Sequence, residues 1–444
     1  MRLLRYLSPI QTILLGFTLL SVIGALILMT PLASPTQTWQ PFLDALFMAT
    51  SAISTTGLGV VSVSDHYNQF GQIVMLILVQ IGGLGYMTLI AFTLYLFGRR
   101  LSMHGGSLMQ ETIAAPSRGE IKQFVKQVIW FTTVFELLGT MALTLFWLQE
   151  FPIAKALYYG IFHAISAFCT AGFALFDSGF EAYRDHVIFN LIINSLSISG
   201  AMGFFVLGES QIVLRKMWQR EPHRLSIHSR LALLVLLLMI VGETAVILIA
   251  ETPPETTQPK PGVMVAAFQA ITAASTTGFN TIDIGSMSDT SLATTGALMF
   301  VGSPAGGTGG GIKSTTFGVL ILWLWAFLRG REDVNVFDRR LPTSTLVQSV
   351  GIALTAAIWL FMSTVILTWT EKLAFLPVMF EAASALGTVG LSTGITSELS
   401  SAGKIIITLT MFIGRVGPLA VATSIFGSSV KTLYRYPSEE IFVG

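Results

Sequence analysis

Long apolar runs alternate along the chain with shorter apolar segments that end in Thr and Gly. A helix needs about 20 mainly apolar residues to cross a bilayer, and the long runs approach or exceed that length. They cover residues 11–29, 72–97, 124–148, 187–214, 231–249, 291–328, 346–368 and 404–426. The pattern predicts an all-α polytopic membrane protein with eight spans.

The four shorter segments repeat one sequence pattern. Each copy of the pattern begins with Phe and reaches Gly ten positions later, and successive glycines stand 115, 106 and 112 residues apart by subtraction of their numbers. The pairs are Phe47 and Gly57, Phe162 and Gly172, Phe268 and Gly278, and Phe380 and Gly390. Four copies at nearly constant spacing are an internal repeat. We therefore expect four tandem helix–pore-loop–helix repeats with pseudo-fourfold symmetry around one ion pore, bounded at 1–100, 101–222, 223–340 and 341–444.

The repeated segments are too short to span a bilayer. They cover residues 41–57, 153–172, 262–278 and 376–390. Irregular backbone occurs at membrane depth only where it is buried in protein or lines water. We therefore interpret these segments as re-entrant half-helices.

The composition supports this class of protein. Hydrophobic residues make up 52% of the chain and charged residues 11%, against about a quarter charged in soluble proteins. The net charge of +1, without a basic patch interleaved with aromatics, gives no support to nucleic-acid binding. The single cysteine, Cys169, excludes an intramolecular disulfide framework.

The distribution of basic residues predicts the orientation. If both termini and the loops 98–122, 215–230 and 329–345 lie on one side, that side holds 18 Lys and Arg, counting Lys126, and the other side holds 5. Cytoplasmic loops carry the excess of Lys and Arg. Both termini are therefore predicted in the cytoplasm, with the chain in the plasma (inner) membrane.

Most acidic residues fall on the outer side, among them Asp44, Asp177, Glu181 and Asp283. Such charges would concentrate cations at an outer pore mouth. Surface acids more often serve only solvation, so both interpretations stay open.

The residues that end each half-helix can coordinate a cation. Backbone carbonyls at such a turn can replace the water around an ion, as in potassium filters, and Gly permits a positive φ with no side chain in the ion path. The predicted ion-binding residues are Thr55, Thr56, Gly57, Thr170, Ala171, Gly172, Thr276, Thr277, Gly278, Thr388, Val389 and Gly390. The simpler interpretation is that Gly only ends a buried helix, but four copies between long apolar runs favour a filter.

The second long run of the third repeat contains a segment too rich in Gly and Pro to remain helical. We interpret it as a movable obstruction beneath the filter. The predicted gate residues are Gly302, Ser303, Pro304, Ala305, Gly306, Gly307, Thr308, Gly309, Gly310, Gly311, Lys313 and Arg415. A phosphate-binding loop would need Gly and Lys adjacent after a strand, and here Ile312 separates them.

Gly pairs at the matching place of the other second runs begin at Gly82, Gly200 and Gly414. They indicate either close helix packing through small residues or a functional break.

Two cations fall inside membrane segments. Lys313 could place a repelling charge in the ion path or extend to the cytoplasmic face. Arg415 is costly to bury, so we expect it to pair with a carboxylate or to cap half-helix carbonyls near the filter. The roles of the intramembrane acids Glu136 and Glu243 stay open.

Enzymatic function has no support, because no Ser, His and Asp set or metal-ligand cluster occurs at usable spacing. His163 occupies the place of Met48, Gln269 and Glu381 in the other copies, which argues against a metal role. Cys169 is expected to be a small buried residue.

With these residues in view, the sequence resembles the Trk/Ktr/HKT superfamily of cation transporters, and most closely the KtrB-type membrane subunits. The resemblance covers essentially the whole chain. It rests on the four filter glycines, the Gly- and Pro-rich segment 302–316, Arg415 and the C-terminal residues 436–444.

The resemblance implies a potassium pore with K+ at the filter glycines and gating by the intramembrane loop. It also implies a homodimer with the C-terminal tail at its interface, surrounding membrane lipid, and a cytoplasmic ring of nucleotide-binding (RCK-type) regulatory subunits. Uptake in the family often depends on Na+, and no covalent cofactor is implied. Some plant relatives carry Ser at the first filter glycine and prefer sodium. Gly57 here supports potassium, while Ala171 and Val389 leave the affinity open.

Two alternatives remain. One is a sodium transporter of the same fold, and the other is a membrane anchor or sensor that conducts nothing. A substrate-carrying secondary transporter has less support, because such proteins more often contain inverted repeats.

Overall fold

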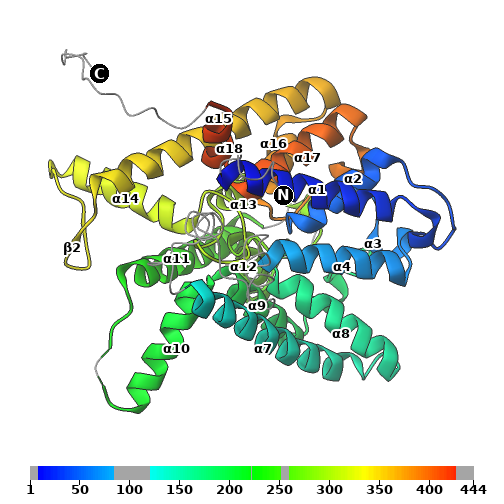
Figure 1. Cartoon of the computed structure of the whole chain (residues 1–444), viewed down its shortest axis with the longest axis horizontal. Helices are drawn as coiled ribbons and strands as arrows, with labels where there is room; N and C mark the ends of the chain where they lie inside the picture. The colour runs from blue at the N-terminus through cyan, green and yellow to red at the C-terminus, as the bar shows by residue number, and fades with distance from the viewer. Residues whose placement is uncertain (1–8, 85–120, 222, 252–259, 427–444) are drawn as a thin grey trace.

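The structure, a computed structural model, describes residues 9–84, 121–221, 223–251 and 260–426 of the 444-residue chain. Most of the predicted basic loop 98–122 and all of the C-terminal tail expected at a dimer interface lie outside these ranges. The described chain is mainly helical, as predicted (Figure 1).

A long helix, a short half-helix and a second helix recur in this order. The first quarter of the chain contains α1 (Pro9–Leu28), η2 (Pro31–Ala33), α2 (Phe42–Ile53), α3 (Val63–His66) and α4 (Gln69–Leu84). The second contains α7 (Ile121–Trp147), α8 (Ile153–Phe168), η3 (Glu181–Tyr183), α9 (Val187–Ala201) and α10 (Phe204–Trp218).

The same order continues in the second half of the chain. The third quarter contains α11 (Ile227–Ala250), α12 (Val263–Ala274), η4 (Ile284–Ser286), α13 (Asp289–Val301) and α14 (Ser314–Leu328), followed by an antiparallel hairpin of β1 (Asn335–Val336) and β2 (Arg339–Arg340). The fourth contains α15 (Thr343–Glu371), α16 (Phe375–Gly387), η5 (Ile395–Glu398), α17 (Ser401–Val416) and α18 (Pro418–Phe426).

Local sequence signals explain where several helices begin. Ser226, Ser288 and Ser400 precede α11, α13 and α17, and each side chain accepts a hydrogen bond from the backbone N–H three residues later. This N-cap bond satisfies a donor that the helix itself leaves unpaired. Pro41 and Pro152 precede the half-helices α2 and α8.

Contacts between elements run in a cycle. The second helix of each quarter packs against the half-helix of the next, as α4 does on α8, α9 on α12 and α13 on α16. The cycle closes where α17 packs on α2. The Phe that begins each copy of the repeated sequence pattern (Phe47, Phe162, Phe268 and Phe380) is buried, with at most 2% of its surface exposed. The four half-helices therefore form the centre of the molecule, surrounded by the longer helices.

Two second helices break where the sequence pattern predicts continuity. The predicted run 187–214 bends by 104° between α9 and α10, beside Gly203 at φ 90°. The predicted run 404–426 divides into α17 and α18 at Gly417, with φ 103°. Because a positive φ is incompatible with a continuing helix, the Gly pairs mark breaks in the second and fourth quarters as well as the third.

Three helices in the described chain are long and apolar enough to cross a membrane: Val125–Trp147, Ile227–Ala250 and Thr343–Glu371. The bent pair α9 and α10 gives a fourth if it counts as one span. Several other apolar helices of the described chain are shorter, with 10–17 residues, so the count of eight spans stays a prediction.

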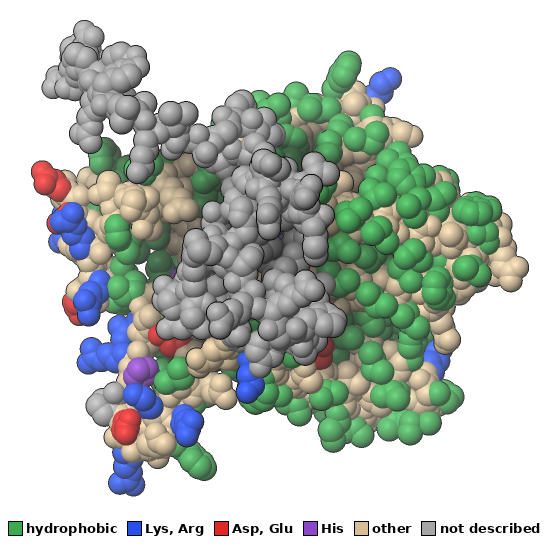
Figure 2. All heavy atoms as spheres, viewed as in Figure 1, with side chains coloured by type: hydrophobic (Ala, Val, Ile, Leu, Met, Phe, Trp, Pro, Cys, Tyr) green, Lys and Arg blue, Asp and Glu red, His purple; other side chains and the backbone are tan. Residues whose placement is uncertain are grey.

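The surface matches a protein embedded in lipid. Large apolar side chains lie exposed on outer helix faces, such as Leu137 at 64% and Phe361 at 71%. α10, α14 and the hairpin project at one end of the molecule (Figure 1), and Lys and Arg side chains gather at that end in Figure 2. The hairpin belongs to the loop 329–345, and α10 and α14 lead into the loops 215–230 and 329–345, for which the charge distribution predicts a cytoplasmic location.

Candidate functional site

Each half-helix ends in the same backbone turn, which we call a filter turn (residues 55–57, 170–172, 276–278 and 388–390). The first residue is a Thr in the left-handed region: φ is 52° at Thr55, 52° at Thr170, 57° at Thr276 and 49° at Thr388. The Gly two positions later also has a positive φ: 92° at Gly57, 69° at Gly172, 85° at Gly278 and 97° at Gly390. A β-branched residue seldom adopts this region, so four such threonines indicate a backbone constrained by its surroundings.

A hydrogen bond of one kind fixes the middle residue of every filter turn. Its backbone N–H donates to the carbonyl five residues earlier in the half-helix, over 2.8 or 2.9 Å. The pairs are Thr56 to Ser51, Ala171 to Ser166, Thr277 to Thr272 and Val389 to Ser384. In the described chain, no hydrogen bond to the carbonyl oxygens of these four middle residues is found. Those oxygens are free to coordinate a cation.

The filter turns meet one another in order. A Cβ added to Gly57 would lie within 3.0 Å of the Ala171 carbonyl oxygen, and one added to Gly278 would meet the Val389 oxygen as closely. Gly172 approaches Thr277 in the same way, and Gly390 approaches Thr56, which closes the ring. The predicted glycines therefore lie together around one axis, where any side chain would displace the next carbonyl.

Buried hydroxyls brace three of the four turns. Ser51 accepts a hydrogen bond from the Gly57 N–H over 3.1 Å, and Ser384 accepts one from the Gly390 N–H over 3.0 Å. Ser166 instead donates to the carbonyl that follows Gly172. The equivalent Thr272 hydroxyl is buried without a partner in the described chain. The ring is therefore fourfold in its backbone but not in its supporting side chains.

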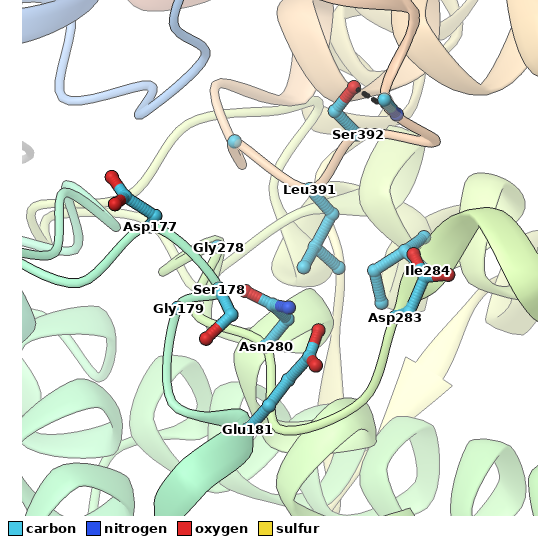
Figure 3. Close-up of a pocket in the computed structure, with 12 residues that line it drawn as sticks. Asp177, Ser178, Gly179, Glu181, Gly278, Asn280, Asp283, Ile284, Leu391 and Ser392 are labelled. Carbon is cyan, nitrogen blue, oxygen red and sulfur yellow. Dashed lines mark hydrogen bonds between the residues drawn. The ribbon is translucent and has the colours of Figure 1, made fainter. Parts of the chain in front are cut away.

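A cavity of about 250 Å³ lies beside two filter glycines, and we call it the outer cavity (Figure 3). Its lining includes Gly278, Gly390, Asp177, Glu181 and Asp283. Three acids named from the sequence thus gather near the filter. Burial and, secondarily, the Asp283 charge raise the pKa of Glu181, as expected where like charges approach.

The Gly- and Pro-rich loop of residues 302–313, predicted to lie inside the membrane and called here the intramembrane loop, lies directly against the filter turns. The Thr308 carbonyl accepts a hydrogen bond from the Thr55 hydroxyl at 3.5 Å, and the Thr308 hydroxyl pairs with that of Thr170 at 3.1 Å. The Gly310 N–H donates to the Thr276 hydroxyl at 3.2 Å. A Cβ on Gly310 would also meet the Thr388 hydroxyl. One loop therefore contacts the first Thr of all four turns.

Lys313 and Arg415, the two cations predicted inside membrane segments, both bind this loop. The Lys313 Nζ donates to the Gly309 carbonyl at 2.6 Å and the Gly310 carbonyl at 3.3 Å, so it faces the loop's own backbone. The Arg415 guanidinium donates to the carbonyls of Thr308 and Gly82. The sequence predicted either a carboxylate partner or half-helix carbonyls for Arg415. It does bind carbonyls, but these carbonyls belong to the intramembrane loop and to α4 and not to a half-helix.

The Gly pairs also have a packing role. A Cβ on Gly82, Gly200 or Gly414 would collide with the backbone near the end of a half-helix. The residues that it would meet are Ile53, Phe168 and Leu386, respectively. Small residues thus let the second helices approach the filter closely.

One ion pair between the first and fourth repeats was missed in the sequence. The Lys404 Nζ lies 2.6 Å from an Asp44 carboxylate oxygen, and both side chains are about four-fifths buried, with 18% and 20% exposed. The pair joins α17 to α2 across the junction of the fourth and first repeats. Its residues stand 360 positions apart, so no local signal links them.

The buried polar residues left open are hydrogen-bonded. Glu136 accepts a bond from the Gln80 amide at 2.9 Å, and Glu243 accepts one from Thr295 at 2.6 Å. His163 bonds through both ring nitrogens, to the Tyr159 carbonyl and the Leu175 N–H. Cys169 is a free buried thiol. In the described residues no group of three or more His, Cys, Asp or Glu could hold a metal ion.

The four filter turns together form a ring of backbone carbonyls. The acidic outer cavity lies beside this ring, and the intramembrane loop is hydrogen-bonded to it. Such a ring can replace the hydration shell of a monovalent cation.

Comparisons with known proteins agree with this chemistry. Residues 5–431 match the family model of TrkH, described as a cation transport protein. The chain is 37% identical to Ktr system potassium uptake protein B of Vibrio alginolyticus over 98% of this chain and 94% of that protein. It is 35% identical to the protein of the same name in Bacillus subtilis, over 98% and 97% of the two chains.

Two further similarities extend the comparison. The chain is 30% identical to potassium/sodium uptake protein NtpJ of Enterococcus hirae, over 100% of this chain and 99% of that protein. The crystal structure of the potassium transporter TrkH from Vibrio parahaemolyticus shares the fold, with a TM-score of 0.71 at 21% identity, over 93% of this chain and 83% of that one. The chain belongs to the TrkH family of cation transport proteins, a family of membrane transporters and not of enzymes.

Proposed function

We propose that the protein takes up K+ across the plasma membrane through the four filter turns, as a gated, channel-like pore. The observation that carries the proposal is the ring of filter turns. In this ring each filter glycine lies against the carbonyl oxygen of the middle residue of the next filter turn. The names of the two Ktr relatives, both potassium uptake proteins, support K+ as the ion.

In this proposal the intramembrane loop is the gate. Support comes from its contacts with the first Thr of all four filter turns and from the Arg415 bond to Thr308. Backbone hydrogen bonds from Ser303 to Gly310 and from Thr308 to Gly200 hold the loop closed on itself and on α9. If the loop moves to open the pore, these backbone hydrogen bonds must break and the freed groups must find other partners.

The proposal includes Na+ dependence, a homodimer, cytoplasmic termini and control by a cytoplasmic nucleotide-binding subunit. Na+ dependence is supported by the name of the Enterococcus relative. The basic end formed by α10, the hairpin and the neighbouring loops offers a surface on which a regulatory subunit could dock.

Expression should restore the growth of bacteria that lack their own potassium uptake systems at low external K+. The regulatory subunit is supplied in the same strain, and protein in the membrane is quantified. Absence of rescue with protein present would count against potassium uptake.

A sodium transporter of the same fold is the second candidate, favoured by the potassium/sodium name of NtpJ. Isotope uptake with competing ions separates the two, because the transported ion is the one that saturates flux.

A further inference from the structure

The residue that follows the Phe of each repeated sequence pattern has a different chemistry in every repeat. These residues are Met48, His163, Gln269 and Glu381, and each is at most 1% exposed. Because they occupy equivalent places behind the filter turns, they show which interaction each repeat uses there.

In three repeats a neutral side chain contacts the segment that leaves the filter. His163 accepts a hydrogen bond from the Leu175 N–H over 3.1 Å. Gln269 donates to the Thr281 hydroxyl over 3.1 Å. The Met48 thioether lies beside Gly59. In each of these repeats the side chain contacts a residue two or three positions after the filter glycine, and so it fixes the segment that follows the filter turn.

The fourth repeat places a carboxylate at this position. Glu381 accepts hydrogen bonds from the Ser392 hydroxyl, at 2.9 Å, and from the Thr396 hydroxyl. The two hydroxyl oxygens also lie 2.9 Å apart. Among the described residues, no ion pair joins Glu381 to a Lys, Arg or His side chain.

If Glu381 is ionised, the cluster has too few hydroxyl hydrogens to make all three of its contacts hydrogen bonds. Two hydroxyls supply two hydrogens, whereas the three contacts among these groups require three. The Glu381 side chain is 0% exposed, and a buried carboxylate without a compensating charge is costly. The cluster therefore needs a positive charge that no described Lys, Arg or His side chain supplies, which is either a proton on Glu381 or a bound cation.

We propose that Glu381, Ser392 and Thr396 bind one Na+ ion, which enters from the outer cavity past Ser392. Ser392 lines that cavity together with Gly390 and Leu391. Carboxylate and hydroxyl oxygens are hard donors suited to alkali and alkaline-earth cations. One carboxylate balances a monovalent ion and leaves no net charge in a buried place. The hydroxyl of Thr393, next to Ser392 in the chain, is also buried without a partner in the described chain.

The site deepens the proposed function, and it rests on that function for its physiological role. Ser392 stands two residues beyond Gly390, so an ion bound there orders the segment that leaves the fourth filter turn. Sodium would thereby act on the potassium filter from outside the ion path.

The test measures ion binding without transport. Purified full-length protein in lipid nanodiscs is unfolded thermally at fixed K+ while Na+ replaces choline. We expect Na+ to raise the Tm of the natural protein. Glu381→Gln should lose this rise and keep the response to K+. Ser392→Ala should require about tenfold more Na+, equivalent to about 1.4 kcal/mol.

Two comparisons separate the loss of a sodium site from misfolding and from the loss of any buried hydroxyl. Gln269 already occupies the equivalent place in the third repeat, so an amide at 381 is compatible with the fold. Thr281→Val removes a hydroxyl from that repeat and should leave the Na+ response unchanged.

The proposal is overturned if the natural protein shows no Na+ response, if Glu381→Gln retains it, or if only pH changes the Tm, since the occupant would then be a proton. Sodium binding at Glu381 in a protein that fails to take up K+ would reject the proposed function and keep this site.

Discussion

Replacing Gly278 by Ala tests whether the filter turns act as one ring. A Cβ on Gly278 would lie 2.9 Å from the Val389 carbonyl carbon and nearer still to its oxygen. The obstacle is backbone of the next filter turn, so it cannot rotate away as a side chain would. The φ of +85° at Gly278 adds about 1–2 kcal/mol of strain for a residue with a Cβ.

We expect Gly278→Ala to lower the preference for K+ over Na+ about tenfold, because about 1.4 kcal/mol of lost ion stabilisation has that effect. The assay is uptake of labelled K+ in cells or vesicles with Na+ as competitor. Gly330→Ala is the matched control: its φ is +64°, and nothing lies within 4 Å of its added Cβ. It imposes similar backbone strain far from the filter and should leave selectivity unchanged.

Unchanged ion competition in Gly278→Ala, with normal amounts of protein in the membrane, would remove this glycine from the ion path. Equal losses in both variants would show that strain alone, and not the approach to Val389, causes the effect.

Three further predictions concern the gate, the ion pair and the outer loops. Shortening residues 305–311 should raise K+ flux in the absence of the regulatory subunit, and unchanged or lower flux would return the loop to a packing role. Asp44→Ala should destabilise the protein by about 1.5–3 kcal/mol, and a double-mutant cycle with Lys404→Ala should show coupling, whereas additive effects would mean that the pair contributes nothing. Hydrogen bonds from the hydroxyls of Ser62 and its neighbour Ser64 lower the pKa of Asp177. Its stabilising contribution is therefore full above the unfolded pKa of about 3.9 and is lost as pH falls through the lower folded pKa, so the Tm difference from Asp177→Asn should shrink on acidification and not on alkalinisation.

The helical class and the glycine turns could be predicted because both follow from local patterns. Hydrophobic run length identifies membrane helices, and a positive φ restricts Gly57 and its three equivalents. The left-handed φ of Thr55 and its equivalents could not be predicted, since propensity disfavours it and only the surrounding half-helices impose it.

Contacts between distant parts of the chain were the main omission. Asp44 and Lys404 were assigned to the same side of the membrane, and the structure brings them into contact, but nothing in either segment indicates that they pair. Arg415 was expected either to pair with a carboxylate or to cap half-helix carbonyls, yet its partner Thr308 is a loop residue of a different repeat. The breaks at Gly203 and Gly417 were recoverable, because the same Gly pair recurs in all four repeats.

The ring is built from one polypeptide, and this has a consequence for how it can change over time. In a channel assembled from identical subunits, each substitution alters every position around the axis at once. Here a substitution at Ala171 or Val389 alters a single quadrant and leaves three intact. Evolution can therefore tune ion preference in small steps, and different quadrants are free to take on separate duties.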